Sequence, residues 1–165
     1  YKKLINKYKL NRKIWLFDYA LGNNTSNKKL FLSNLSYNST MSSFNKGSNY
    51  LKLKNLILND KKNKKFDIIK QKKFDQVFKN KNIKNSFLKI DVEGYEYNVL
   101  KGASKKIKDT KYILIENQFS NQYQNNFDKV KKLLVKYNFL MIKSFYYPTM
   151  HYRDILYINK NYKKK

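Results

Sequence analysis

Two acidic residues that could do chemistry, Asp91 and Glu93, stand two positions apart directly before Gly94. They follow a strand-like stretch within the segment FLKIDVEGYEYNVLKGA, residues 87–103. A carboxylate at the tip of a strand, beside a glycine that lets a ligand approach the backbone, can orient a cofactor amine, accept a proton or bind a metal. If the extended conformation continues through Glu93, both side chains lie on one face and can share one task.

The same residues also have a structural interpretation. Asp91 or Glu93 could cap the helix that follows and favour its dipole, with Lys89 as a solvent-exposed neighbour. A divalent metal held by the two acids is chemically possible because carboxylates suit Mg²⁺ and Mn²⁺, but two acids are a small ligand set and we assign no metal site. From these residues alone, function and capping remain equally open.

The composition indicates a folded domain with an unusual charge. Of the 165 residues, 41% are hydrophobic and 16% aromatic, too many for a disordered chain, and the length fits a single domain. The net charge of +26 would suit nucleic acid or an anionic membrane. Arginine, which favours bidentate contacts with phosphates and bases, occurs only at Arg12 and Arg153. A solvated lysine surface is therefore favoured over a nucleic-acid footprint.

Several kinds of site are disfavoured. The chain has no cysteine, which excludes disulfides, thiol nucleophiles and cysteine-bound zinc and mildly favours a reducing compartment. His151 is the only histidine, so a histidine metal site is equally poor. No apolar run reaches the length that spans a membrane. The sequence therefore predicts a cytoplasmic protein with no membrane span.

The first half of the chain is predicted to contain a helix and several strands. Apolar residues at helical spacing predict a helix within residues 1–12, and KIWLFDYAL (13–21) is predicted to form a strand that ends at Gly22. The polar stretch 34–49 is long enough to be a functional lid. The other predicted elements are strands at 29–33, 51–58, 66–71 and 86–91 and a short helix at 74–78.

After Gly94 the pattern alternates between helix and strand. One helical face collects four apolar residues, Tyr95, Val99, Leu100 and Ala103. Gly102 is a candidate for the left-handed residue just past the end of this helix. The apolar run in TKYILIENQ (110–118) predicts a strand that is covered on both faces.

The end of the chain completes an α/β pattern. An amphipathic helix begins near Phe127 and ends at Asn138, and strands at 139–145 and 154–159 follow. Alternating strands and helices predict an α/β domain with a parallel sheet whose last strand runs antiparallel. In such sheets ligands bind outside the carboxyl ends of the strands, which is where Asp91 and Glu93 stand.

The most distinctive stretch, LKIDVEGYEYNVLKGA, closely resembles the signature of the FkbM-type methyltransferases, S-adenosylmethionine-dependent enzymes with a Rossmann-like class I fold. Other stretches resemble the family in the same order: FDYALGNN (17–24), MSSF (41–44), ILIEN (113–117) and DILYIN (154–159). Only residues 87–103 are specific. The resemblance implies methyl transfer from S-adenosyl-L-methionine, with a hydroxyl of a sugar or other small metabolite as the expected acceptor.

The resemblance also implies a role for each residue of the site. Asp91 would lie beside the methionine part of the cofactor and the substrate, with Glu93 and Lys89 as neighbours and Gly94 as the point of close backbone approach. The adenine is expected near Asp18, Tyr19 and Ala20. The transfer is an in-line displacement at a sulfonium methyl, for which the protein supplies alignment and, for a hydroxyl acceptor, a base. Asp91 is the first choice for that base or for an orienting group, and Glu93 the second.

The chain departs from the family at its beginning. Such enzymes start with a strand and a glycine-rich loop, but this sequence has four glycines and no G-x-G pattern before the first strand. In the family order, the missing first and second strands would lie between the strands at 13–21 and 86–91, and their loss would leave unpaired edges. We therefore expect residues 1–165 to form a partial methyltransferase domain that, on its own, binds the cofactor weakly or not at all.

Two alternatives remain beside an active methyltransferase. One is a lysine-rich module that binds nucleic acid without catalysis, and the other is an inactive remnant of a methyltransferase. The methyl acceptor is expected to contact the loops 34–49 and 146–153. Weak candidates for that contact are Tyr37, Tyr147, His151 and Arg153. Arg153 has the best claim because arginine can grip an anionic group, although an ion pair with Asp154 is the alternative.

Overall fold

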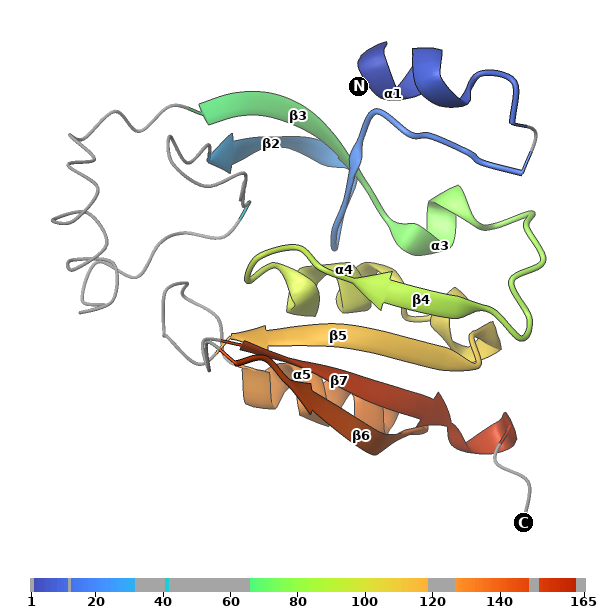
Figure 1. The fold of residues 1–165 in the computed structure, drawn as a ribbon, viewed down its shortest axis with the longest axis vertical. Coiled ribbons are helices and arrows are strands. Elements are labelled where there is room, and N and C mark those ends of the chain that lie inside the picture. The colour runs from blue at the N-terminus through green and yellow to red at the C-terminus, as the bar shows by residue number, and fades with distance from the viewer. Residues whose placement is uncertain are drawn as a thin grey trace, which may run out of the picture.

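The computed structural model describes residues 2–11, 13–31, 41, 66–118, 127–148 and 152–162 (Figure 1). The predicted lid at 34–49, apart from Met41, and the predicted strand at 51–58 lie outside these residues. The described elements before the signature segment are α1 (Lys2–Tyr8), β1 (Ala20–Leu21), β2 (Ser26–Phe31), β3 (Phe66–Lys72), α3 (Phe74–Val77) and β4 (Phe87–Ile90). Those that follow are α4 (Glu96–Gly102), a 3₁₀ helix (Lys106–Asp109), β5 (Tyr112–Gln118), α5 (Phe127–Lys136), β6 (Phe139–Tyr146), β7 (Tyr152–Asn159) and a second 3₁₀ helix (Lys160–Tyr162).

The strands form two sheets of mixed direction. The larger sheet has the order β4-β5-β7-β6, in which β4 and β5 are parallel and β7 runs antiparallel to both of its neighbours. The smaller sheet has the order β1-β3-β2, with β1 parallel and β2 antiparallel to β3. The predicted α/β class and the antiparallel last strand are confirmed. Within the described part of the chain, β4 pairs with β5 alone.

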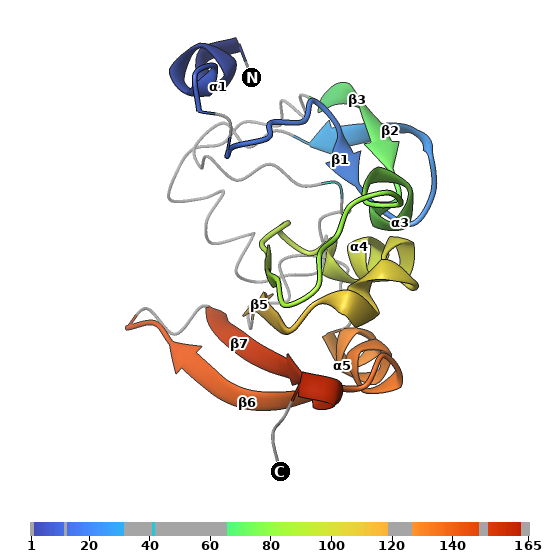
Figure 2. The ribbon, with the colours of Figure 1, turned by 90° about the vertical axis from the view of Figure 1, so that its right-hand side faces the viewer.

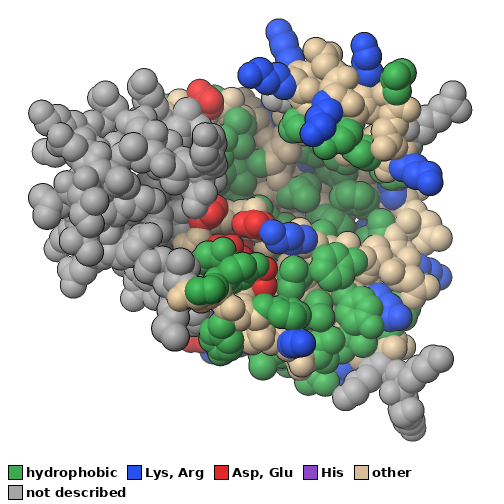
Figure 3. All heavy atoms as spheres, viewed as in Figure 1, with side chains coloured by type: hydrophobic (Ala, Val, Ile, Leu, Met, Phe, Trp, Pro, Cys, Tyr) green, Lys and Arg blue, Asp and Glu red, His purple; other side chains and the backbone are tan. Residues whose placement is uncertain are grey.

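Helices cover one face of the larger sheet. Figure 2 shows α4 and α5 on the same side of β5, β6 and β7. Accordingly β5 alternates, with Ile113 and Ile115 fully buried and Tyr112 and Leu114 only partly buried. The prediction that this strand is covered on both faces was wrong, because both neighbouring helices pack on the same side. Figure 3 looks onto the other face, where hydrophobic side chains gather.

The core lies between this sheet and its two helices. Val130 and Leu134 give α5 its buried face, and the helix ends where Asn138 adopts the predicted left-handed conformation, with φ of 68°. The largest fully buried apolar side chains are Phe139, Leu100, Ile107, Ile113, Ile115, Leu134 and Ile155. None of the helices in the described residues is long and apolar enough to cross a membrane.

The predicted strand at 13–21 was mostly wrong. Only Ala20 and Leu21 form a strand, which pairs with the last two residues of β3. The residues before them are not part of a strand, and Trp15 and Phe17 are exposed. An apolar stretch with good strand propensity forms a strand only where a neighbouring strand completes its hydrogen bonds.

Candidate active site

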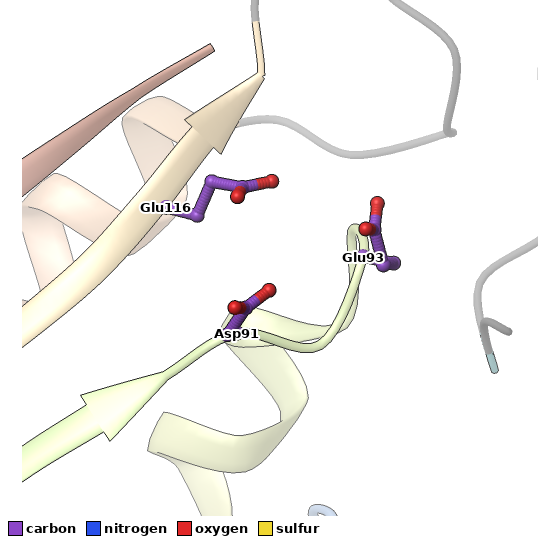
Figure 4. A group of neighbouring side chains, drawn as sticks. All are labelled: Asp91, Glu93 and Glu116. Atoms are coloured by element: carbon purple, nitrogen blue, oxygen red, sulfur yellow. The ribbon is translucent and has the colours of Figure 1, made fainter. Parts of the chain in front are cut away.

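Three carboxylates meet at the carboxyl ends of the parallel strands β4 and β5. Ile90 of β4 pairs with Ile115 of β5, so the residues that follow them in the two parallel strands, Asp91 and Glu116, are neighbours. Glu93 joins them from the turn that follows β4 (Figure 4). One carboxylate oxygen from each of Asp91, Glu93 and Glu116 lies within 4.8 Å of the others. The structure thus brings the two predicted acids together and adds a third.

A tight turn, and not a continued strand, places Glu93. β4 ends at Ile90, and the Tyr95 N–H donates to the Val92 carbonyl at 3.2 Å. Glu93 and Gly94 both have positive φ, 50° and 90°. The extended conformation that would place Asp91 and Glu93 on one face of a strand thus ends before Glu93, and the turn instead brings the Glu93 carboxylate close to Asp91. Holding a non-glycine residue in this conformation costs about 1 kcal/mol or more, which the surrounding contacts must offset.

Glu96 holds the turn from inside. Its Oε1 accepts a hydrogen bond of 2.9 Å from the Gly94 N–H, and its side chain is 2% exposed. Burial raises the pKa of Glu96, and hydrogen bonds from the backbone N–H groups of Glu96 and Gly94 act in the opposite direction. Gly94 is itself buried, so its clear role in the structure is to form the turn. Sequence reasoning missed Glu96, although its position two residues after a break glycine was a signal for such a contact.

Neither predicted acid caps the helix. The residue at the start of α4 is Tyr95, and no side chain makes a capping hydrogen bond there. Asp91 instead accepts a bond of 2.8 Å from Lys89 Nζ, between side chains that are about half exposed. This bond is the main cause of the raised pKa of Lys89. A pair this exposed contributes at most about 1 kcal/mol to folding, so its importance is to fix the direction of the Asp91 carboxylate.

Glu116 and Gln118 complete the group from β5. Gln118 Nε2 donates to Glu116 Oε1 at 2.9 Å and also to Glu93 Oε2. Burial raises the pKa of Glu116 to about 7, the bond from Gln118 opposes the rise, and the charges of Asp91, Glu93 and Asp154 add to it. The sequence analysis placed Glu116 only within a stretch that resembles the family and gave Gln118 no role. The signal for both was their position at the carboxyl end of the strand beside β4.

A fourth acid stands across the sheet. Asp154 on β7 is the register partner of Glu116, is buried, and accepts a hydrogen bond of 3.0 Å from the Tyr147 hydroxyl. That bond is the main cause of the raised pKa of Tyr147. Arg153 Nη1 donates to the Tyr146 hydroxyl at 2.8 Å. Four of the chain's 11 acidic residues thus gather at this end of the sheet. Figure 3 shows acidic side chains together near the middle of this face, beside hydrophobic ones.

The residues expected near the adenine lie at the start of the smaller sheet. Ala20 is the first residue of β1, and Asp18 and Tyr19 come directly before it. Asp18 is exposed, and Tyr19 is half-buried with Lys72 Nζ 4.3 Å from its ring centre. The three carboxylates accept hydrogen bonds from Lys89 and Gln118. Tyr37 and His151 lie outside the described residues.

A buried hydrogen-bond chain instead links the signature segment to the smaller sheet. The Tyr95 hydroxyl donates to Gln71 Oε1 at 2.9 Å, and Gln71 Nε2 donates to the Asn24 carbonyl at 2.9 Å and to Asn24 Oδ1 at 2.6 Å. Gln71 is 1% exposed. The stretch 17–24 is therefore linked to the signature segment through its last residue, Asn24.

The arrangement suits a positively charged ligand. Four carboxylates and one lysine leave a negative charge that attracts cations, and the group lies where α/β sheets bind ligands. The spacing of Asp91, Glu93 and Glu116 would also admit a divalent ion, although exposed acids often gather without one and we assign no metal here. The cluster can orient a cationic group and accept a proton.

Comparison with known proteins identifies the family. A family model described as the methyltransferase FkbM domain matches residues 2–141. Neither the comparison with curated proteins nor that with solved structures found a match. The matched range covers most of the chain and includes the signature segment, the turn and three of the four clustered acids. The chain belongs to the FkbM methyltransferase family.

Proposed function

We propose that the protein transfers a methyl group from S-adenosyl-L-methionine to a hydroxyl of a sugar or another small hydroxylated metabolite. The observation that supports this most directly is the convergence of Asp91, Glu93 and Glu116 at the carboxyl ends of β4 and β5. The most specific segment of the sequence folds so that Asp91 and Glu93 belong to this group, while Tyr95 and Glu96 are buried. Family membership supplies the reaction class.

The charge of the cluster fits the cofactor. When bound, S-adenosyl-L-methionine supplies a methyl group on a positively charged sulfur, next to a positively charged amino group. Carboxylates favour both charges at short distance, more so where the site is partly buried. We infer that Asp91, fixed by Lys89, orients the methionine part, and that Glu93 contacts it from the turn.

We also propose that this chain forms one part of a larger Rossmann-like domain. Two features support this: β4 has one partner strand in the described residues, and Ala20, which follows Asp18 and Tyr19, belongs to a separate sheet. A strand inserted beside β4 would pair the open edge and bring the two sheets into one. The adenine and ribose would then bind near β1, at the far side of the inserted strands.

Titration calorimetry with S-adenosyl-L-methionine tests the function. The two proteins to compare are this chain and a longer form that includes any residues its gene encodes before Tyr1. We expect weak or undetectable binding by the chain alone and clear binding by the longer form. Asp91→Ala in the longer form should weaken binding by about tenfold or more, since it removes a charge-assisted contact.

A matched control separates local from general charge effects. Asp128→Ala removes the same charge from an exposed side chain of α5 and should leave the affinity unchanged. If the longer form does not bind the cofactor, the proposed activity is wrong and only the ancestry of the fold remains. If Asp128→Ala weakens binding as much as Asp91→Ala does, the cluster has no specific role.

A further inference from the structure

We propose that Glu116, and not Asp91, accepts the proton that the acceptor hydroxyl loses during methyl transfer. This inference rests on the proposed function and assigns a role within the same site. Glu116 lies on β5, beside Asp91 and Glu93 of the signature segment and near the same carboxyl ends of the strands (Figure 4).

The contacts of Asp91 and Glu93 make them poorer candidates. Asp91 Oδ2 already accepts a bond of 2.8 Å from Lys89 Nζ, so an acceptor hydroxyl would have to compete with an ammonium group. Glu93 sits in a turn with positive φ and accepts a bond from Gln118. The charged donor suits Asp91 to orientation better than to proton transfer, and Glu93 stands on a turn and not on a paired strand.

The position of Glu116 suits proton transfer. β5 is paired on both sides, with β4 and β7, so its backbone is among the most constrained parts of the sheet. Gln118 on the same strand donates to Oε1 at 2.9 Å, which restrains the carboxylate, and one carboxylate oxygen of Glu116 lies within 4.8 Å of those of Asp91 and Glu93. A proton acceptor on a rigid strand keeps the alignment that an in-line displacement requires.

The charges around Glu116 come from three elements. Asp91 and Glu93 approach from the turn after β4, Asp154 from β7, and Lys89 from β4 itself. Partial burial and, to a smaller extent, the three acids favour the protonated form of Glu116, and its pKa is raised to about 7. A general base whose pKa lies near the working pH combines a useful fraction of the ionised form with a real tendency to take a proton.

Methyl transfer and proton transfer occur together in the proposed step. As the acceptor oxygen forms its bond to the methyl carbon, the carbon–sulfur bond breaks, the sulfur keeps that electron pair, and the hydroxyl proton passes to the Glu116 carboxylate. Protonated Glu116 then loses the proton to water after the product leaves. Asp91 stays paired with Lys89 throughout.

Carboxyl-labelled glutamate makes Glu116 directly observable. The chain has three glutamates, Glu93, Glu96 and Glu116, so a protein labelled with ¹³C at the side-chain carboxyl gives three signals. Glu116→Gln assigns one of them by its disappearance. On the chain as it is, we expect this signal to titrate with a midpoint of about 7. A midpoint near the ordinary glutamate value would overturn the proposal.

Two substitutions test the cause of the shift with opposite signs. Asp91→Asn removes a neighbouring negative charge and should lower the Glu116 midpoint by roughly half a unit or more. Gln118→Met removes a hydrogen bond that favours the carboxylate and should raise it. Asp128→Asn, on exposed α5, should not move it. If Asp91→Asn leaves the midpoint unchanged, the two carboxylates do not share a site and the proposal fails.

The cofactor separates a proton acceptor from a cofactor contact. In the longer form, adding S-adenosyl-L-methionine should lower the Glu116 midpoint, because a positive charge nearby favours the carboxylate. Glu116→Gln should keep the cofactor affinity within about threefold, in contrast to Asp91→Ala. Loss of affinity with Glu116→Gln would make Glu116 a cofactor-binding residue and overturn the proposal. Failure of the proposed function is a different outcome, since the longer form then binds no cofactor whatever the titration of Glu116 shows.

Discussion

The backbone at Gly22 lies so close to Gly102 that a Cβ atom placed on Gly102 would be 1.9 Å from the Gly22 carbonyl oxygen. This contact joins the loop after β1 to the last residue of α4. Gly102 therefore serves a close approach of two backbones. The sequence predicted that Gly102 is the left-handed residue just past the end of this helix. Gly102 is instead the last residue of α4, Ala103 follows it, and among the described glycines only Gly94 has positive φ.

Gly102→Ala is expected to destabilise the protein strongly. The new methyl group meets a carbonyl of the main chain, which cannot rotate away as a side chain can, so α4 and the smaller sheet must move apart. We expect the free energy of unfolding to fall by about 2–4 kcal/mol in urea. Lys101→Ala, the exposed neighbour on the same helix, is the control and should change it by less than about 0.5 kcal/mol. Equal effects of the two substitutions would refute the close approach.

Removing the Tyr95 hydroxyl should also cost stability. Tyr95→Phe leaves the side-chain oxygen of Gln71, 1% exposed, without its donor at 2.9 Å. We expect a loss of about 1–2 kcal/mol in the free energy of unfolding. Tyr97→Phe, on the half-buried side of the same helix, controls for the loss of a hydroxyl in general. If Tyr95→Phe is added to Gln71→Met, its effect should shrink, because the oxygen that it leaves unpaired is already gone; full additivity would argue against a direct bond.

Glu96 should be necessary for the turn as an acceptor and not as a charge. Glu96→Ala removes the side-chain acceptor of the buried Gly94 N–H and should lower the free energy of unfolding by about 2–3 kcal/mol. Glu96→Gln keeps an oxygen in place and removes a charge that burial disfavours, so it should cost less than Glu96→Ala. The measurement is urea unfolding of both variants at one pH. A larger loss for glutamine than for alanine would show that the charge itself holds the turn.

Local patterns were sufficient for the elements that carry their own signals. The amphipathic spacing of α5 and the left-handed Asn138 follow from neighbouring residues, and the structure has both. The prediction of a strand at 13–21 was mostly wrong because apolar residues form a strand only if a partner strand lies beside them. The prediction that β5 is covered on both faces was wrong for a similar reason, since its apolar run does not reveal that both helices lie on one face of the sheet.

In the candidate site, too, some residues can be found from a local pattern and others cannot. Asp91 and Glu93 could be found from one short segment because a glycine and a strand end stand beside them. Glu116 lies 25 residues beyond Asp91 in the chain, and only the pairing of β4 with β5 brings the two together. Its raised pKa depends on burial and on charges from three elements, which no local spacing encodes.

The titration of Glu116 predicts a specific pH dependence of stability. Its pKa is raised from 4.5 to about 7 on folding, so between these values the folded protein binds a proton more tightly than the unfolded chain. The free energy of unfolding therefore falls as the pH rises from about 5 to 8, by about 1–3 kcal/mol from this residue, with solvent exposure of the site reducing the effect. The glutamine in Glu116→Gln does not ionise, so this variant should lose this part of the pH dependence of stability.

Urea unfolding of the wild type and Glu116→Gln at pH 5, 6, 7 and 8, at constant ionic strength, measures this contribution as a difference. The difference should grow with pH in favour of the glutamine variant, because ionisation then penalises the wild type alone. Asp128→Asn, whose side chain is 72% exposed, should give a difference from the wild type that is nearly constant over the same range. A constant difference for Glu116→Gln as well would mean that Glu116 ionises at its ordinary pH in the folded protein, and a proton acceptor tuned by its neighbours would then be ruled out.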